Sequence, residues 1–135
     1  MPPKRDRPNG RPKATIVVVN DNPEFLELAQ TLLQEEGYRV EVCQEGQRAY
    51  AFVKKAMPAL VILDVRIVGV GEWQVLDMLK LDPETAKIPI LVCSAAVNEV
   101  RAVEARLHEQ GCEILFKPFE IDELLEKVQR LTGPQ

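Results

Sequence analysis

The sequence predicts an α/β fold: a doubly wound sheet of five parallel strands with helices on both faces. Two observations predict it. Five short apolar runs recur along the chain, and a segment with apolar residues at helical spacing follows each run. Regular alternation of strand and helix patterns is typical of βα units, whose strands pair in parallel. With 135 residues, the chain has the length of one domain with a single sizeable core.

The first two βα units occupy residues 14–56. A strand is predicted over residues 14–19. Asn22 can cap the helix that follows, Pro23 suits its first position, and Gly37 ends it. A second strand is predicted over residues 38–43, and its polar residues fit an edge of the sheet. A helix over residues 46–56 follows, with an apolar face formed by Ala49, Phe52, Val53 and Ala56.

The remaining three units begin with a continuous apolar run over residues 60–63, which indicates a strand buried on both faces. The third helix is expected to begin near Glu72 and to end at Asp82. The fourth strand is predicted over residues 89–93, and one helix carrying Val100, Val103 and Leu107 follows it. The fifth strand covers residues 112–116. The last helix has an apolar face formed by Ile121, Leu124, Leu125 and Val128, and Gly133 ends it.

Composition excludes several classes of protein. The apolar fraction of 46% and the charged fraction of 28% are ordinary for a globular protein, and no run is long enough to cross a bilayer. Residues 1–13 are basic and rich in proline, so we expect a disordered tail. The rest of the chain is acidic, which argues against nucleic acid as its direct ligand. The three cysteines lack metal-ligand spacing and are expected to be free, buried thiols in a reducing, cytoplasmic setting.

Polar residues follow four of the five predicted strands. Asn20 and Asp21 follow the first strand, Asp64 the third, Ser94 the fourth and Lys117 the fifth. The carboxyl ends of parallel strands meet at one edge of the sheet, where such folds bind ligands. Two acids, an amide, a hydroxyl and an amine together suit a carboxylate that accepts a phosphoryl group beside a divalent cation.

With these residues at these strand ends, residues 14–132 resemble the receiver domain of bacterial two-component response regulators. The resemblance implies strand order 2-1-3-4-5, five flanking helices and a flavodoxin-like fold. It also implies that Asp64 accepts a phosphoryl group from the phosphohistidine of a sensor histidine kinase or phosphotransfer protein. Mg²⁺ would be held by Asp21, by Asp64 and by the backbone carbonyl of Arg66, with Asn20 acting through water.

The resemblance assigns two further residues to the phosphoryl group. Lys117 would contact one oxygen as a point charge, and the hydroxyl of Ser94 would contact another and draw its loop inward. The bond between Lys117 and Pro118 is commonly cis in the family. The sequence also departs from the family: Asn20 replaces an acid, Arg66 is long and cationic, and Ile114 occupies the place of an aromatic switch residue. These departures predict a weakened metal site and a muted conformational response.

Three functions remain open from the sequence. The first is a signalling receiver that has no output domain and is not itself an enzyme. It would act by docking a downstream protein, and a homodimer is compatible with this function. The second is a receiver-like binding module that works without phosphorylation. The third, an aspartyl-phosphate phosphatase, is disfavoured because Arg66 stands where that class needs its general acid. No membrane association is expected, and a dinucleotide enzyme is disfavoured because the first βα turn lacks glycine.

Overall fold

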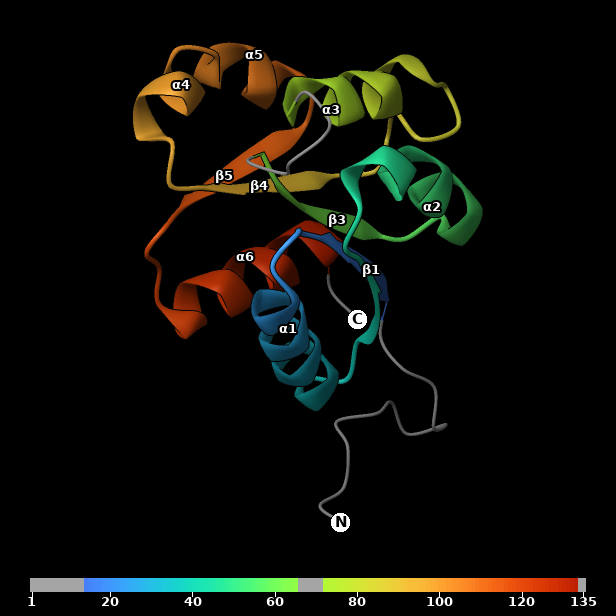
Figure 1. Ribbon diagram of the computed structural model, residues 1–135, viewed down its shortest axis with the longest axis vertical. Coiled ribbons are helices and arrows are strands. Elements are labelled where there is room, and N and C mark those ends of the chain that lie inside the picture. Colours follow the sequence, from blue (N-terminus) through green and yellow to red (C-terminus); the bar gives the residue numbers. More distant parts are fainter. Residues whose placement is uncertain (1–13, 66–71, 134–135) are drawn as a thin grey trace.

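Five parallel strands form one sheet in the order β2-β1-β3-β4-β5 (Figure 1), as the sequence predicts. The computed structural model describes residues 14–65 and 72–133, so the predicted tail over residues 1–13 lies outside the described residues. The strands are β1 Thr15–Val19, β2 Arg39–Cys43, β3 Leu60–Asp64, β4 Ile90–Ser94 and β5 Cys112–Phe116. Since β2 lies at one end of this order, its assignment as an edge strand is confirmed.

Helices cover both faces of the sheet. In the described ranges these are α1 Pro23–Glu35, α2 Ala49–Ala56, α3 Glu72–Leu81, α4 Val97–Arg101, α5 Glu104–Glu109 and α6 Ile121–Thr132, with a short 3₁₀ helix, η1, over Gly46–Arg48. Helices α1 and α6 lie on one face, and α2, α3, α4 and α5 lie on the other (Figure 1). The connections therefore wind in both directions, as expected for a doubly wound sheet.

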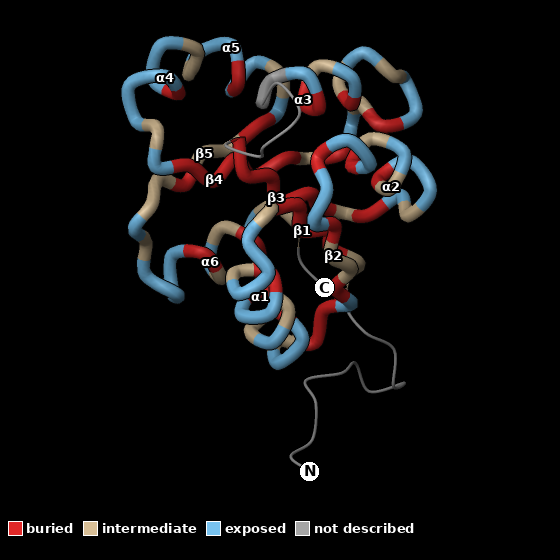
Figure 2. The backbone as a smooth tube through the Cα atoms, viewed as in Figure 1, coloured by how far each residue is buried: buried red, intermediate tan, exposed pale blue. Residues whose placement is uncertain are grey.

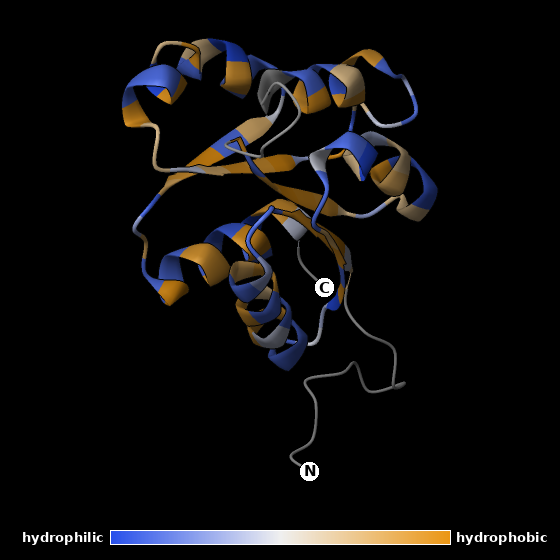
Figure 3. Ribbon diagram, viewed as in Figure 1, coloured by the Kyte–Doolittle hydropathy of each residue, from blue (hydrophilic) through white to orange (hydrophobic). Residues whose placement is uncertain are grey.

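The core consists of two apolar layers, one on each face of the sheet. Alternate residues of β1 point to opposite layers: Ile16 and Val18 pack with α1 and α6, whereas Val17 and Val19 pack with the other helices. Every residue of β3 and β4 is buried. Figures 2 and 3 show the strands as the buried and hydrophobic centre of the molecule. The continuous apolar run before Asp64 is thus explained by burial on both sides.

The first helix begins as the sequence predicts. The Asn22 side-chain oxygen accepts hydrogen bonds from the backbone N–H groups of Glu24, at 2.9 Å, and of Phe25, at 3.3 Å. Pro23 occupies the first turn, where no backbone donor is needed. This cap fixes the direction in which α1 leaves the carboxyl end of β1, and it places Phe25 in the first turn beside that end of the sheet.

Two helix assignments differ from the prediction. The segment after β4 forms two helices, α4 and α5, instead of one, so six α-helices replace the expected five in the described residues. The break falls at Val103, whose φ of −122° is outside the helical range, and β-branched residues favour helix poorly. Both Val100 and Leu107 are nevertheless buried. Residues 46–48 are 3₁₀ rather than α-helical, with glycine, a poor helix former, at the start.

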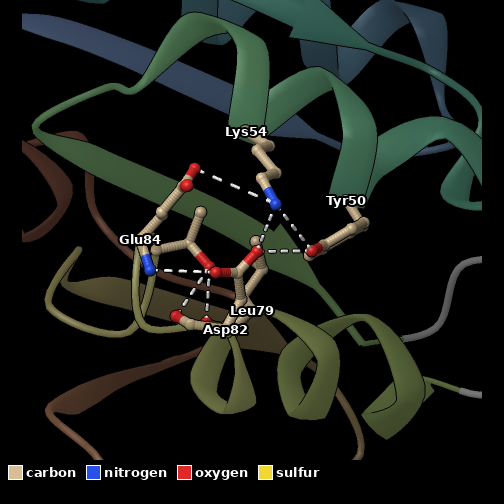
Figure 4. A network of polar contacts seen from close by, with 6 residues as sticks. Tyr50, Lys54, Leu79, Asp82 and Glu84 are labelled. Carbon is tan, nitrogen blue, oxygen red and sulfur yellow. Dashed lines mark hydrogen bonds and ion pairs between the residues drawn. The ribbon is translucent and has the colours of Figure 1, made fainter.

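A polar network ties α2 to the turn after α3 (Figure 4). The Lys54 ammonium lies 2.8 Å from Asp82 Oδ2, and the Tyr50 hydroxyl donates to the same oxygen. The other carboxylate oxygen accepts the backbone N–H of Glu84 at 2.9 Å. The hydrogen bond from Lys54, followed by that from Tyr50, lowers the pKa of Asp82 to about 2. The ionised Asp82 therefore holds two helices together on this face of the sheet.

Candidate functional site

The carboxyl ends of β1, β3, β4 and β5 border a cleft. Its walls come from the loop after β1, the first turn of α1, the end of β3 and the loops after β4 and β5. The lining residues are Asn20, Asp21, Asn22, Phe25, Asp64, Ala95, Lys117, Pro118 and Phe119. Four of the side chains that the sequence singles out, those of Asn20, Asp21, Asp64 and Lys117, are therefore brought together.

Asp64 is the last residue of β3 and is only 6% exposed. Its Oδ2 accepts hydrogen bonds from Lys117 Nζ at 2.9 Å and from Asn20 Nδ2 at 3.0 Å. A buried carboxylate is unfavourable without such partners, since it gives up its hydration. One cation and one amide donor on the same oxygen supply such partners.

Asn20 is oriented by its own loop. It is 1% exposed, and its Oδ1 accepts the backbone N–H of Asn22 at 2.8 Å. Since the oxygen is committed to the loop, the nitrogen faces Asp64 and donates to it. Asn20 therefore presents N–H groups, and not an oxygen ligand, toward the carboxylate. An aspartate at this position would present an anion there.

Asp21 supplies the second carboxylate of the cleft. It is partly exposed, and its backbone carbonyl accepts Gln44 Nε2 at 3.4 Å. Mg²⁺ is typically held by one or two carboxylates with several waters, so Asp21 and Asp64 fit it. The predicted third ligand, the carbonyl of Arg66, lies outside the described residues. Over residues 14–65 and 72–133, no three or more His, Cys, Asp or Glu side chains gather in a group that could hold a metal ion.

Lys117 follows β5 and reaches across the cleft to Asp64. Its backbone N–H donates to the carbonyl of Ser94 at 2.8 Å, and its bond to Pro118 is cis, as in the family that the sequence resembles. The Lys117 ammonium also lies over the ring of Phe25, 5.2 Å from the ring centroid. Sequence reasoning missed Phe25. The available signal was an aromatic residue in the first turn of a helix that begins at the site.

Ser94 is fully buried at the end of β4, and its neighbour Ala95 lines the cleft. The Ser94 hydroxyl oxygen accepts the backbone N–H of Ala96 at 2.9 Å, which leaves its proton available for another acceptor. Ile114, the predicted switch position, pairs with Val92 of β4 and packs partly buried against the layer under α2–α5.

An aromatic side chain does lie beside Ser94 in the sheet. Phe116 pairs with Ser94 in the register of β4 and β5. The Arg101 guanidinium, at the end of α4, lies 5.0 Å from the centroid of the Phe116 ring. No sequence motif marks Phe116 as a site residue. The aromatic side chain near Ser94 is thus Phe116, two residues after Ile114 in β5, and its ring contacts α4.

The cysteines are free and buried, as predicted. Cys93 lies opposite Asp64 in the register of β3 and β4. Burial raises the pKa of the Cys93 thiol to about 12, so this group stays neutral at physiological pH. Its role next to Asp64 is that of a small apolar side chain, and it adds no negative charge to the site.

Comparison with known proteins agrees with this architecture. The family model of the response regulator receiver domain matches residues 16–129. Relatives include the DNA-binding dual master transcriptional regulator RpaA of Synechocystis sp., which is 28% identical over 86% of this chain and 48% of its own length. The probable transcriptional regulatory protein TcrX of Mycobacterium tuberculosis is 30% identical over 93% of this chain and 52% of its own length. The chain thus spans about half the length of these two relatives.

Other relatives match along nearly their whole length. The polar-differentiation response regulator DivK of Brucella anthropi is 26% identical over 88% of this chain and 96% of its own length. Among solved structures, the chemotaxis response regulator CheY4 of Vibrio cholerae has a TM-score of 0.77 and 25% identity, covering 87% of this chain and 98% of its own.

The receiver domain of the sensor histidine kinase PA1611 of Pseudomonas aeruginosa, solved with a magnesium ion in its active-site cleft, has a TM-score of 0.76. At 23% identity, over 90% of this chain and 98% of its own, it shows the shared fold. None of the helices in the described part of the chain combines the length and the apolar character of a membrane span. With its strand order, its cleft and the family match over residues 16–129, this chain belongs to the response regulator receiver domain family.

Proposed function

We propose that Asp64 accepts a phosphoryl group and that the chain acts in two-component phosphorelay signalling. The observation that carries this proposal is the cleft itself, which Asp64 lines together with a second acid, Asp21, and where Asp64 lies 2.9 Å from the Lys117 ammonium. The donor would be the phosphohistidine of a sensor histidine kinase or phosphotransfer protein in the cytoplasm. The output would be docking of a downstream protein partner rather than turnover of a substrate.

The transfer is a substitution at phosphorus. An Asp64 oxygen forms a bond to phosphorus, the bond from phosphorus to the donor imidazole nitrogen breaks, and the imidazole leaves with that electron pair. Both reactants are anionic, so positive charge near the phosphoryl oxygens lowers the barrier. When bound, Mg²⁺ would supply part of that charge, held by Asp21 and Asp64, with the Arg66 carbonyl as a further proposed ligand. The predicted water on Asn20 would need the second lone pair of its Oδ1, because the amide nitrogen faces Asp64 and Oδ1 already accepts the N–H of Asn22.

Two residues of the chain would act on the transferred group. As the carboxylate of Asp64 becomes an acyl phosphate and loses its charge, the Lys117 ammonium would pair with a phosphoryl oxygen instead, a charge-assisted bond that strengthens as charge develops. The Ser94 hydroxyl would donate a hydrogen bond to another phosphoryl oxygen. Because the backbone carbonyl of Ser94 accepts the N–H of Lys117, at 2.8 Å, movement of either residue would be passed to the other.

Incubation with acetyl phosphate and Mg²⁺, followed by intact-protein mass spectrometry, tests the proposal. We expect the mass of one phosphate to be added to the wild type and none to Asp64→Asn. Asp122→Asn serves as the matched control, because Asp122 is an exposed acid in the first turn of α6, and it should be labelled like the wild type. Equal labelling of Asp64→Asn would refute the assignment.

A second function is favoured by one observation. Asp64 Oδ2 already accepts bonds from Asn20 and Lys117, so the chain could hold a single conformation and bind a partner without phosphorylation. The same experiment separates the two functions. A receiver takes up phosphate from acetyl phosphate, whereas a phosphorylation-independent binding module keeps its mass unchanged under conditions that label a known receiver.

A further inference from the structure

We propose that Phe25 is a positioning residue for Lys117: its ring holds the lysine ammonium in the cleft and directs it at Asp64. The kinetic consequence rests on the proposed phosphoryl transfer, while the positioning itself does not. No sequence motif marks Phe25, which enters the site only through its place in the first turn of α1.

The geometry shows one ammonium between two partners. Lys117 Nζ lies 2.9 Å from Asp64 Oδ2 and 5.2 Å from the centroid of the Phe25 ring. Cations within about 6 Å of a ring centroid are attracted by the negative face of the ring. The side chain of Lys117 is 29% exposed, so water solvates it only in part. Both Phe25 and Lys117 line the cleft, so the ring borders the space that a phosphoryl group would enter.

The ring is itself held in place from two directions. The backbone N–H of Phe25 donates to the Asn22 cap at 3.3 Å, which anchors the turn that carries the ring. The ring of Phe119, two residues after Lys117, packs against it with centroids 6.5 Å apart and planes 88° apart. Such perpendicular pairs are a favourable aromatic geometry. A ring fixed in this way limits the directions open to a flexible lysine.

This arrangement has a consequence for transfer. A lysine side chain has a flexible four-carbon stem and loses considerable rotamer entropy when it is ordered. During transfer the Lys117 ammonium must exchange Asp64 Oδ2 for a phosphoryl oxygen. Contact with the Phe25 ring keeps it inside the cleft during that exchange, because the ring remains a partner whatever the charge on Asp64. Loss of the ring would leave the ammonium freer to turn toward solvent.

A set of variants separates positioning from simple packing. We expect Phe25→Leu, which keeps an apolar side chain but removes the ring, to lower the phosphorylation rate by acetyl phosphate about fivefold, equivalent to about 1 kcal/mol. Phe25→Tyr should restore the rate, because it restores the ring. Phe52→Leu removes a partly buried ring from the opposite face of the sheet and should leave the rate unchanged. In a Lys117→Ala background, Phe25→Leu should lower the rate no further.

A spectroscopic measurement tests the positioning without phosphorylation. In the wild type and in Phe25→Tyr, the ring current should move the NMR signals of the Lys117 ε-methylene protons upfield, and in Phe25→Leu they should return to ordinary values. Ordinary shifts in the wild type would overturn the proposal. So would an equal effect of Phe25→Leu with and without Lys117. If the wild type takes up no phosphate, the proposed function fails, and the ring-current shifts alone decide the role of Phe25.

Discussion

Replacing Asn20 by aspartate tests the electrostatics of the site most sharply. A carboxylate oxygen placed where Asn20 Nδ2 lies would be 3.0 Å from Asp64 Oδ2. At an effective dielectric constant near 20, two unit charges at that separation repel by about 5.5 kcal/mol. Side-chain rotation and sharing of a proton would relieve part of this repulsion. The variant also loses a hydrogen bond to a charged group, worth about 1.5–3 kcal/mol.

We therefore expect Asn20→Asp to lower the free energy of unfolding by about 2 kcal/mol in EDTA, which corresponds to a fall in Tm of about 8 °C for a domain of this size. A bound cation changes the effect of the added carboxylate from destabilising to stabilising, since Asp64 and the new aspartate then both contact the cation. Excess Mg²⁺ should raise the Tm of Asn20→Asp more than that of the wild type, and titration calorimetry should show Mg²⁺ binding about tenfold tighter, or about 1.4 kcal/mol.

Asn22→Asp is the matched control for this experiment. It adds the same charge to the same loop, but the Asn22 side chain caps α1 and accepts from Glu24 and Phe25 rather than facing Asp64. Aspartate caps helices as well as asparagine, so the Tm in EDTA should stay near that of the wild type. The reasoning is refuted if Asn20→Asp melts with the wild type in EDTA, or if the wild type already binds Mg²⁺ as tightly as Asn20→Asp.

Three further outcomes are expected. Lys117→Ala should keep its circular dichroism spectrum but be phosphorylated at least about tenfold more slowly, since a charge-assisted bond is worth about 1.5–3 kcal/mol; an equal rate would contradict the role of Lys117. Because Lys54 lowers the pKa of Asp82 to about 2 from 3.8, the ionised Asp82 stabilises the fold above that ordinary value, and the contribution is lost as pH falls toward 2. Asp82→Asn should therefore lower the Tm at neutral pH. The difference in Tm between this variant and the wild type should become smaller in melts below pH 3.8, and a difference that does not change with pH would contradict the role of the network. Beryllium fluoride with Mg²⁺ should shift amide signals strongly near Asp64 and Ser94 but weakly over α4, because Ile114 lacks a ring; large shifts across α4 would contradict this.

The pattern of strands and helices was predictable from the sequence because buried positions recur with the period of the strand or helix that carries them. The apolar run before Asp64 indicated a strand covered on both faces, and the alternation of segments indicated parallel order. The break between α4 and α5 was not readable, because Val100, Val103 and Leu107 keep helical spacing across it. Their spacing shows which face is buried, but it does not show the break, which depends on the backbone angles at Val103.

The gathering of Asp21, Asp64 and Lys117 in one cleft was also predictable, since parallel strands bring their carboxyl ends together. The orientation of Asn20 was not, because it depends on a single hydrogen bond from the backbone of Asn22. The contact between Phe25 and Lys117 was equally hidden, since it depends on the direction of the first turn of α1 and on a lysine rotamer. The assignment of Arg66 stays a prediction, because it lies outside the described residues.

The central claim, that Asp64 is the acceptor, is tested most directly by chemical trapping. An aspartyl phosphate is an acyl phosphate, and borohydride reduces it to homoserine at the residue that carried the phosphate. After treatment with acetyl phosphate and Mg²⁺, reduction and peptide mass spectrometry should find homoserine at position 64 and nowhere else. Homoserine at Asp21 or at another aspartate, or none at position 64 in protein that gained the mass of a phosphate, would contradict the account.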